Sequence, residues 1–279
     1  MPDAYLDADE IRASTFVRRV EIHETLGSTN DRAAELARDA DIKLPALVAA
    51  RHQTAGRGRG SNTWWSDDGA LTFSIILDPT AFGISAANWP QLSLATAVAI
   101  CNALAFELNP KSGRSLSAAA ESPKSVDLAI KWPNDIMLDD RKLCGILIES
   151  PGGLAPAKDR LVLGIGININ NSLRAAPREL ASYAISLCDV SAMQHSPQKV
   201  LIQVLDEFER QLVRLELHDP QLPLAWQHLC WLLQKKLNAQ VGRQIFAGIC
   251  MGIADDGALL IETGSTITSI YGGSLRLGS

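Results

Sequence analysis

A segment rich in glycine and arginine constrains this chain more than any other part of it. Residues 53–65 read Gln-Thr-Ala-Gly-Arg-Gly-Arg-Gly-Ser-Asn-Thr-Trp-Trp and follow a short apolar run, residues 46–50, that is typical of a strand. Glycine allows the backbone to turn and to approach a ligand closely, while arginine offers fixed positive charge with paired donors for carboxylate and phosphate. The segment therefore predicts a loop that wraps a small anion.

The charge balance of the chain supports this interpretation over a merely solvated basic loop. The net charge is -5, so the protein has no global attraction for nucleic acid, and no nucleic-acid partner is expected. Against that background Arg51, Arg57 and Arg59 form a local cluster of positive charge. An acidic protein with one focused basic loop suits a small anionic ligand better than a polyanion.

Length and composition indicate a globular protein of one large and one small domain. The 279 residues are 47% hydrophobic and 20% charged, and no apolar run is judged long enough to cross a bilayer. Residues 1–10 lack the order of a signal peptide, so a cytoplasmic location without a membrane partner is expected. The five cysteines are scattered without metal-ligand spacing, which predicts buried thiols and no metal-binding cluster.

Periodicity predicts an α/β chain with a mixed sheet and flanking helices. Alternating apolar residues predict strands at residues 19–24, 71–77, 128–131, 135–138, 142–149 and 161–167, with a hairpin around the acidic turn at 139–140. Helical spacing predicts helices that begin at Ser28 and at Ser196-Pro197, and others at residues 92–108 and 222–234. Residues 111–125 lack periodicity and predict a surface insertion. From residue 237 onward, short strands and turns predict a small β-barrel.

A second segment with chemical potential is Lys131-Trp132-Pro133-Asn134-Asp135, followed seven residues later by Lys142. Either lysine alone would be interpreted as an exposed strand charge. The turn at Asp139-Asp140, however, can direct Lys142 back over the sheet toward whatever the glycine loop holds. Pro133 interrupts ladder pairing, so the two polar residues after it are expected at a strand end.

Two further segments have both a structural and a functional interpretation. Gly164 and Gly166 lie on one face of a buried strand, where they leave room either for a ligand ring or for close packing. Ser28-Thr29-Asn30 is typical of a helix cap, and a helix start with free amides and hydroxyls also suits a polar head group.

Taken together, these segments resemble the biotin protein ligases. The resemblance extends from about residue 21 to the end, and rests on residues 28–30, 53–59 with Trp64, 131–135 with 141–147, and 164–168. It implies a class II synthetase-like catalytic domain with a mixed sheet and helices, expected at residues 1–235. A small C-terminal β-barrel is expected at residues 236–279.

The resemblance also implies an activity and a set of site residues. Biotin would be activated with ATP and Mg²⁺ as biotinyl-5′-adenylate, then transferred to a lysine of a biotin carboxyl carrier protein. Binding of biotin and ATP would fall to Ser28, Thr29, Asn30, Gln53, Gly56, Arg57, Gly58, Arg59, Trp64, Asn134, Lys142, Gly164, Gly166, Asn168 and Tyr183. The catalytic residues would be Lys142, Arg57, Arg59 and Asp135.

The implied chemistry explains why cations are needed. A carboxylate that attacks the α-phosphorus of ATP brings two anions together, and Arg57, Arg59, Lys142 and Mg²⁺ can offset the negative charge that develops. In the second step the acceptor amine must be neutral, and Asp135 is a hypothetical aid to its deprotonation. The adenylate is already an activated acyl group, so no nucleophilic side chain is required.

Three departures from the family pattern stand out. Only 27 residues precede Ser28, so the DNA-binding winged helix of some relatives is not expected. Gly60-Ser61-Asn62 stands where many relatives carry further basic residues. Tyr183 is the aromatic residue expected to stack on adenine, because residues 171–182 contain no tryptophan.

Alternatives to a biotin ligase remain open from the sequence. A lipoate or octanoate protein ligase would share the fold and the adenylation chemistry. A non-catalytic module that senses biotin or nucleotide is disfavoured by the presence of Arg57, Arg59 and Lys142. A P-loop is excluded by the absence of its motif, and a Rossmann site is disfavoured by glycine spacing. A homodimer through an exposed sheet edge is possible.

Overall fold

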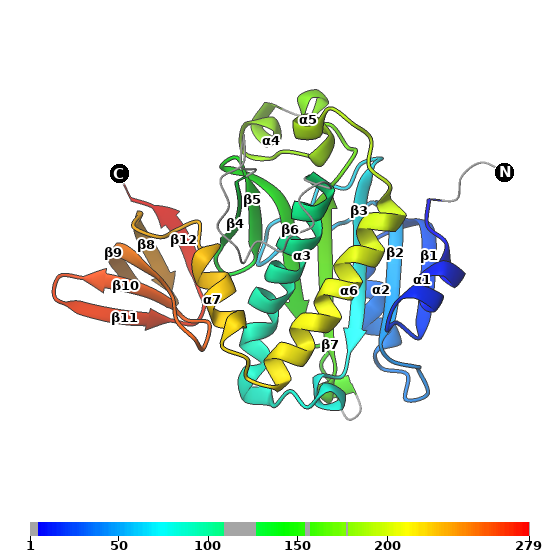
Figure 1. The fold of residues 1–279 in the computed structure, drawn as a ribbon, viewed down its shortest axis with the longest axis horizontal. Coiled ribbons are helices and arrows are strands. Elements are labelled where there is room, and N and C mark those ends of the chain that lie inside the picture. Colours follow the sequence, from blue (N-terminus) through cyan, green and yellow to red (C-terminus); the bar gives the residue numbers. More distant parts are fainter. Residues whose placement is uncertain (1–4, 109–126, 154–156, 177, 279) are drawn as a thin grey trace.

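The computed structural model describes residues 5–108, 127–153, 157–176 and 178–278. The insertion predicted at residues 111–125 lies outside these residues. Within them, the larger part of the molecule is built on a seven-stranded sheet of order β1-β2-β3-β7-β6-β5-β4 (Figure 1). Its strands are β1 Arg19–Leu26, β2 Ala46–Gln53, β3 Ala70–Leu77, β4 Leu128–Lys131, β5 Asp135–Leu138, β6 Arg141–Glu149 and β7 Leu161–Asn168.

This sheet is mixed, as predicted. β1 and β2 pair in parallel, whereas β2 to β3, β3 to β7 and the remaining neighbours pair antiparallel. β3 and β7 lie at its centre and are buried along their whole length. Asp139 and Asp140 turn the β5–β6 hairpin with φ of 49° and 61°, the left-handed conformation that a two-residue hairpin turn requires.

Two long helices cover one face of the sheet. α3 Leu92–Leu108 and α6 Pro197–Glu216 lie side by side across it (Figure 1). The other helical segments are α1 Ala8–Ser14, α2 Thr29–Leu36, α4 Arg178–Tyr183, α5 Leu187–Ser191 and α7 Gln221–His228, with 3-10 turns η1 Pro79–Phe82, η2 Ala86–Gln91, η3 Ala157–Asp159 and η4 Leu173–Ala175. Of these, α2 packs on β2, β3 and β7 and forms a second, smaller apolar cluster with them.

Strand alternation gives the two faces of the sheet different characters. Phe73, Ile75, Ile146 and Ile165 point to the face under α3 and α6 and join the main core. Their neighbours along the strands belong to the other face, which α2 covers only in part. That face carries the polar side chains and glycines of β3 to β7, and we call it the open face.

One expectation about composition is wrong. Residues 86–108, which include η2 and α3, form a helical segment long and apolar enough by length and composition alone to cross a membrane. In the fold, α3 packs against both the sheet and α6 beside it, and its side chains from Leu92 to Leu104 are largely buried there. The apolar run is therefore explained by its place in the core.

The C-terminal strands form a second sheet. β8 Lys236–Val241, β9 Gln244–Ile253, β10 Leu259–Thr263, β11 Thr266–Ile270 and β12 Ser274–Leu277 pair antiparallel in the order β11-β10-β9-β8-β12. Buried side chains of this sheet, such as Leu237 and Leu259, belong to the same core cluster as α3. The indole Nε1 of Trp132 also donates to the carbonyl of Gly257 at 2.9 Å, so the two sheets share an interior.

The helical expectations are partly right. The helix predicted at residues 222–234 ends at His228, because the chain after it runs beside β4, where Ile130 and Leu229 share a backbone hydrogen bond. Ser28 stands at the N-cap of α2, but its side chain makes no capping hydrogen bond. The helix α1 was not predicted.

Leu212 of α6 provides a test of the shared core. Its side chain is fully buried, and replacing it by alanine is expected to cost about 2–5 kcal/mol of unfolding free energy because a cavity remains. The adjacent Val213 is 46% exposed, and Val213→Ala is expected to change stability by less than about 0.5 kcal/mol. Urea denaturation followed by circular dichroism measures both; equal effects would contradict the packing of α6 described here.

Candidate active site

A cavity of about 890 Å³ lies on the open face of the large sheet. The sequence-predicted site residues that line it are Ser28, Thr29, Asn30, Gln53, Arg57, Gly58, Arg59, Trp64, Asn134, Asp135, Lys142, Gly164, Gly166 and Tyr183. They come from the start of α2, the loop after β2, strands β5 to β7 and the end of α4. Segments that are far apart in the chain therefore meet at one hollow.

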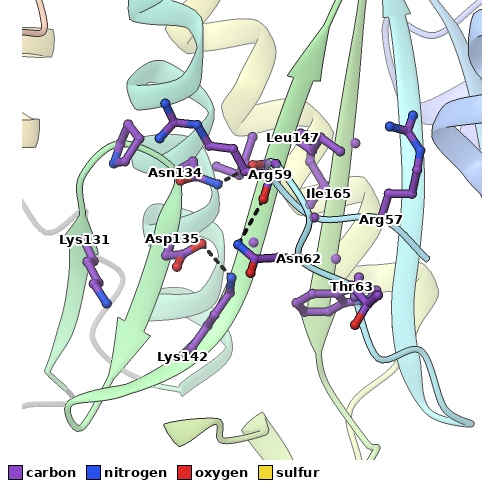
Figure 2. A pocket seen from close by; sticks show the side chains of 18 of the residues that line it. Arg57, Arg59, Asn62, Thr63, Lys131, Asn134, Asp135, Lys142, Leu147 and Ile165 are labelled. Carbon is purple, nitrogen blue, oxygen red and sulfur yellow. Dashed lines mark hydrogen bonds and ion pairs between the residues drawn. The ribbon is translucent and has the colours of Figure 1, made fainter. Parts of the chain in front are cut away.

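Lys142 stands on the floor of this cavity (Figure 2). Its ammonium lies 2.7 Å from a carboxylate oxygen of Asp135 and 5.9 Å from the centre of the Trp64 ring. The β5–β6 turn brings the lysine back alongside β5, since Lys142 pairs with Met137 of that strand. Asp135 and Trp64 thus hold a flexible cation in one place and leave its charge facing the cavity.

The glycine-rich loop folds as a hairpin that reaches over the open face. Its two arms are joined by hydrogen bonds from Trp64 to Gly56 at 2.9 Å and from Gly58 to Asn62 at 2.8 Å. Gly60 at its tip has φ of 66°, a conformation that favours glycine. The hairpin carries Trp64 onto β7, where a Cβ at Gly166 would collide with the indole.

The second glycine of β7 makes room for a different side chain. A Cβ at Gly164 would collide with the carboxamide of Asn30. The space above the two glycines is therefore filled by Asn30 and Trp64, which form the inner wall of the cavity. The indole Nε1 of Trp64 is buried and lacks a hydrogen-bond partner among the residues that the structure describes.

A chain of hydrogen bonds runs through the polar end of the cavity. Gln53 Oε1 accepts from the backbone amide of Thr29 at 2.7 Å. Thr29 Oγ1 lies 2.8 Å from Ser74 Oγ, which in turn lies 2.7 Å from Asn30 Oδ1. Asn30 Nδ2 then donates to the carboxylate of Glu149 at 2.9 Å. Because these groups hold one another, the polar surface that they present has a fixed shape.

Arg57 is held at the edge of this network by two carboxylates. Its guanidinium forms a two-pronged pair with Glu149, at 2.8 and 2.6 Å, and lies 2.8 Å from Asp31. Burial by itself raises the pKa of the Glu149 carboxyl, but hydrogen bonds from Arg57 and Asn30 outweigh it and hold that pKa below its ordinary value of 4.5. Glu149 is therefore an anion at neutral pH.

Arg59, the second arginine of the loop, joins the C-terminal sheet instead. Its guanidinium donates to the carbonyl of Gly273 at 2.9 Å, just before β12. Gly273, Ser274 and Leu275 line the same cavity, so the C-terminal sheet supplies part of its wall. The two arginines of the loop are thus anchored on opposite sides of the hollow.

Comparison with known proteins identifies the family to which this fold belongs. The family model described as Biotin/lipoate A/B protein ligase family matches residues 23–168, which is more than half of the chain. The bifunctional ligase/repressor BirA of Bacillus subtilis is 32% identical over 261 residues, which are 92% of this chain and 73% of that protein. This chain belongs to the biotin/lipoate protein ligase family.

Other members of the family agree in fold and extent. The biotin–[acetyl-CoA-carboxylase] ligase of Paracoccus denitrificans is 31% identical over 84% of this chain and 90% of that protein. A solved structure, the biotin protein ligase from Aquifex aeolicus in complex with biotin and ATP, is 26% identical with a TM-score of 0.75 and covers 94% of this chain and 100% of that one. The resemblance and the α/β fold class inferred from the sequence are confirmed, and the expected C-terminal barrel is described here as a five-stranded antiparallel sheet.

Two residues expected in the ligand site have other positions in this ligase-family fold. Asn168 does not line the cavity; its amide donates to the carbonyl of Ile185 at 3.1 Å and accepts from Asn171, so it fastens the segment after β7. Gly56 is also outside the lining, because the backbone of Trp64 covers it. Both residues support the walls of the site from behind.

Several residues that line the cavity, or that hold its lining from behind as Ser74 and Glu149 do, were missed in the sequence. Ser74 lies within a fully buried strand, and Glu149 ends β6 like an ordinary solvated charge. Trp231, which follows α7, lines the cavity and donates from its indole to Asp140 at 2.7 Å. An alternation count could have placed Ser74 and Glu149 on the same face as Gly164, but the position of Trp231 depends on tertiary packing.

Gly164 offers a test of the inner wall. In Gly164→Ala the new methyl group should displace Asn30 and break its hydrogen bonds, at a cost of about 1–3 kcal/mol in unfolding free energy. Gly27 is a matched control, because a Cβ there meets nothing within 4 Å, and Gly27→Ala should change stability by less than about 0.5 kcal/mol. Chemical denaturation measures the unfolding free energy of both variants. Equal values would contradict the packing of Asn30 on β7.

The lowered pKa of Glu149 predicts a dependence of stability on pH. A carboxyl whose pKa is depressed on folding contributes stability that is present above its unfolded pKa and is lost as pH falls through the folded value. The wild-type protein should therefore exceed Glu149→Gln in unfolding free energy near pH 7, and the gap should close as pH falls below about 4.5. Denaturation curves from pH 7 to pH 3 measure it, and a constant gap would contradict the ion pair with Arg57.

Proposed function

We propose that this chain is an ATP-dependent biotin protein ligase, which forms biotinyl-5′-adenylate and transfers biotin to a lysine of a biotin carboxyl carrier protein. The observation that carries the proposal is the meeting of Lys142, Arg57 and Arg59 at one cavity with a fixed polar pocket. The solved structure of the biotin protein ligase from Aquifex aeolicus, in complex with biotin and ATP, supports it. The two folds match over 94% of this chain and 100% of that one.

The polar end of the cavity suits the ureido group of biotin. Ser28 is buried at the start of α2 and lines the cavity without a side-chain capping bond. Gln53 uses its Oε1 on Thr29, which directs its Nε2 group toward other partners. A ligand with a neutral carbonyl and two N–H groups could use these hydroxyl and amide groups, and a pocket that pairs each of them discriminates against analogues without them.

The cations account for the first chemical step. The biotin carboxylate attacks the α-phosphorus of ATP, an O–P bond forms, and pyrophosphate leaves with the bonding electrons. Lys142 on the cavity floor is placed to contact both reacting anions, and the loop arginines can screen the remaining phosphate charge. Before the ligands bind, Asp135 already holds the lysine ammonium at 2.7 Å. Lys142 therefore loses less conformational freedom when they arrive.

A magnesium ion is proposed to arrive with the nucleotide. The described residues contain no group of three or more histidine, cysteine or acidic side chains that could cage a metal. Mg²⁺ is commonly held by one or two carboxylates together with substrate phosphates, and Asp135 with the Asn134 amide oxygen could provide such a partial set. The bound ion would neutralise charge on the leaving pyrophosphate.

A lipoate or octanoate ligase is the alternative with the same chemistry. Its acyl substrates carry no ureido group, so the fixed hydrogen-bond chain from Gln53 to Asn30 would leave polar groups of the pocket unpaired. This polar end favours biotin. Pyrophosphate release with biotin, lipoate or octanoate as the only acid separates the two functions.

Lys142 and Asp135 are expected to act in different steps. Lys142→Met should lower the rate of biotin-dependent pyrophosphate release by about 100- to 1,000-fold, because one donor to the developing charge is lost. Lys199→Met, on the exposed surface of α6, is the matched control and should retain the wild-type rate. Asp135→Asn should slow biotin transfer from supplied biotinyl-5′-adenylate to a carrier domain.

Each variant tests a separate claim. Wild-type protein that releases no pyrophosphate with biotin and ATP would overturn the proposed function. Full activity in Lys142→Met would remove the lysine from the mechanism. An unchanged single-turnover transfer rate in Asp135→Asn would end the proposed role of that carboxylate in the second step.

A further inference from the structure

His195 is a buried histidine that stands outside the cavity lining, two residues before α6 begins. Its side chain is only 3% exposed. Both ring nitrogens have partners: Nδ1 lies 3.3 Å from Glu107 Oε2 near the end of α3, and Nε2 lies 2.7 Å from Ser191 Oγ at the end of α5. Three segments of the chain therefore meet at one imidazole.

The backbone of His195 is fastened as well. The side-chain amide of Asn170 donates to the carbonyl of His195 at 2.7 Å, and the backbone amide of His195 donates to Asn170 Oδ1 at 2.9 Å. Asn170 in turn donates from its own backbone to the carbonyl of Gly69, directly before β3, at 2.8 Å. The position of His195 relative to the large sheet is thus set by hydrogen bonds on both of its sides.

The segment that ends at His195 supplies part of the cavity wall. We call residues 178–195, which include α4 and α5, the wall segment; the two helices lie together at one end of the large sheet (Figure 1). Tyr183, the last residue of α4, lines the cavity and is 56% exposed. Two residues later, the backbone amide of Ile185 donates to the carbonyl of Lys142 at 3.0 Å. The wall segment therefore places an aromatic ring beside the strand that carries the catalytic lysine.

α5, which lies between Tyr183 and His195, is fastened at two places by different groups. Toward its start, the carboxylate of Asp189 accepts from Ser172 Oγ at 2.7 Å and from the backbone amide of Leu173 at 2.9 Å. This part of α5 follows the loop after β7. Its end follows α3, through the imidazole and Glu107. Two anchors fix the direction of a short helix, and loss of one leaves that direction unspecified.

The turn between α5 and His195 is strained. Ala192 caps α5 with φ of 56°, the left-handed conformation that residues other than glycine adopt at a cost. Such a residue persists only where its surroundings hold it, and the contact of Ser191 with the imidazole spans this turn. Without the ring, the turn is free to relax, and α5 is free to shift with it.

We propose that His195 is a positioning residue for nucleotide binding. By holding the end of α5 against α3, it fixes the wall segment and keeps the Tyr183 ring where an adenine base can stack on it. A ring that is already oriented before the base arrives loses less freedom on binding, so the nucleotide is held more tightly. This inference rests on the proposed function, because ATP is the ligand concerned.

The first experiment measures KM for ATP and KM for biotin by pyrophosphate release. In His195→Leu, KM for ATP should rise at least about fivefold, the factor that corresponds to the lower end of base–aromatic stacking energies, while KM for biotin should stay near the wild-type value. A merely structural role would reduce the folded fraction, which lowers kcat and leaves both KM values unchanged. His228→Leu, at the exposed end of α7, is the matched control and should keep both KM values.

A second experiment tests the route through Tyr183. Ser191→Ala removes one partner of the imidazole but leaves the histidine in the core, so it replaces His195→Leu if thermal melting shows that variant unfolded. It should raise KM for ATP in the same direction by a smaller factor. In a Tyr183→Leu background, either change should add little, because the ring that it acts on is gone.

Three results would overturn the inference. They are an unchanged KM for ATP in the folded variants, an equal rise of KM for biotin and ATP, and full additivity with Tyr183→Leu. Wild-type protein that releases no pyrophosphate with biotin and ATP is a different result and counts against the proposed function itself.

Discussion

The site depends on one constraint, the alternation of side chains across the central strands of the large sheet. Every second residue of β3, β7, β6 and β5 is committed to the core under α3 and α6. The intervening positions face the other side of the sheet, and they include Ser74, Gly164, Gly145 and Asp135. A slip of one residue in the register would bury Asp135 and expose Ile136, so the stability of the core also fixes the geometry of the chemistry.

The positive charges around the cavity are each held by a group of the opposite character. Lys142 has Asp135, Arg57 has Glu149 and Asp31, and Arg59 has the carbonyl of Gly273. Such pairing lowers the mutual repulsion of the cations around the cavity, and it restricts the conformations of their long side chains. An anion that bound beside one of these cations would have to compete with such a partner.

Much of the fold could be predicted because its signals are local. Strands β3 and β7 alternate plainly, the Asp139-Asp140 turn marks the β5–β6 hairpin, and glycine spacing marks the loop after β2. The end of α7 could not be predicted, because it is decided by pairing with Ile130 of a distant strand. Helical periodicity carries no information about such a partner.

The candidate site shows the same division between local and tertiary information. Lys142 and Asn30 both line the cavity, and residue type and spacing were enough to select them. Asn168 does not line it, because a motif marks a position without saying which way its side chain points. Glu149 was missed for the converse reason: a glutamate at a strand end looks solvated until the loop carrying Arg57 folds onto it.

The contribution of the C-terminal sheet to the cavity wall has a consequence for how such proteins can change over time. Gly273 and Leu275 face the same hollow as β6, and Leu259 shares an interior with α3. If the C-terminal sheet were exchanged between relatives, part of the cavity wall and part of the hydrophobic core would be exchanged with it. Inheritance of the large sheet and the C-terminal sheet together is therefore favoured, because recombination at their junction would disturb both the cavity wall and the core.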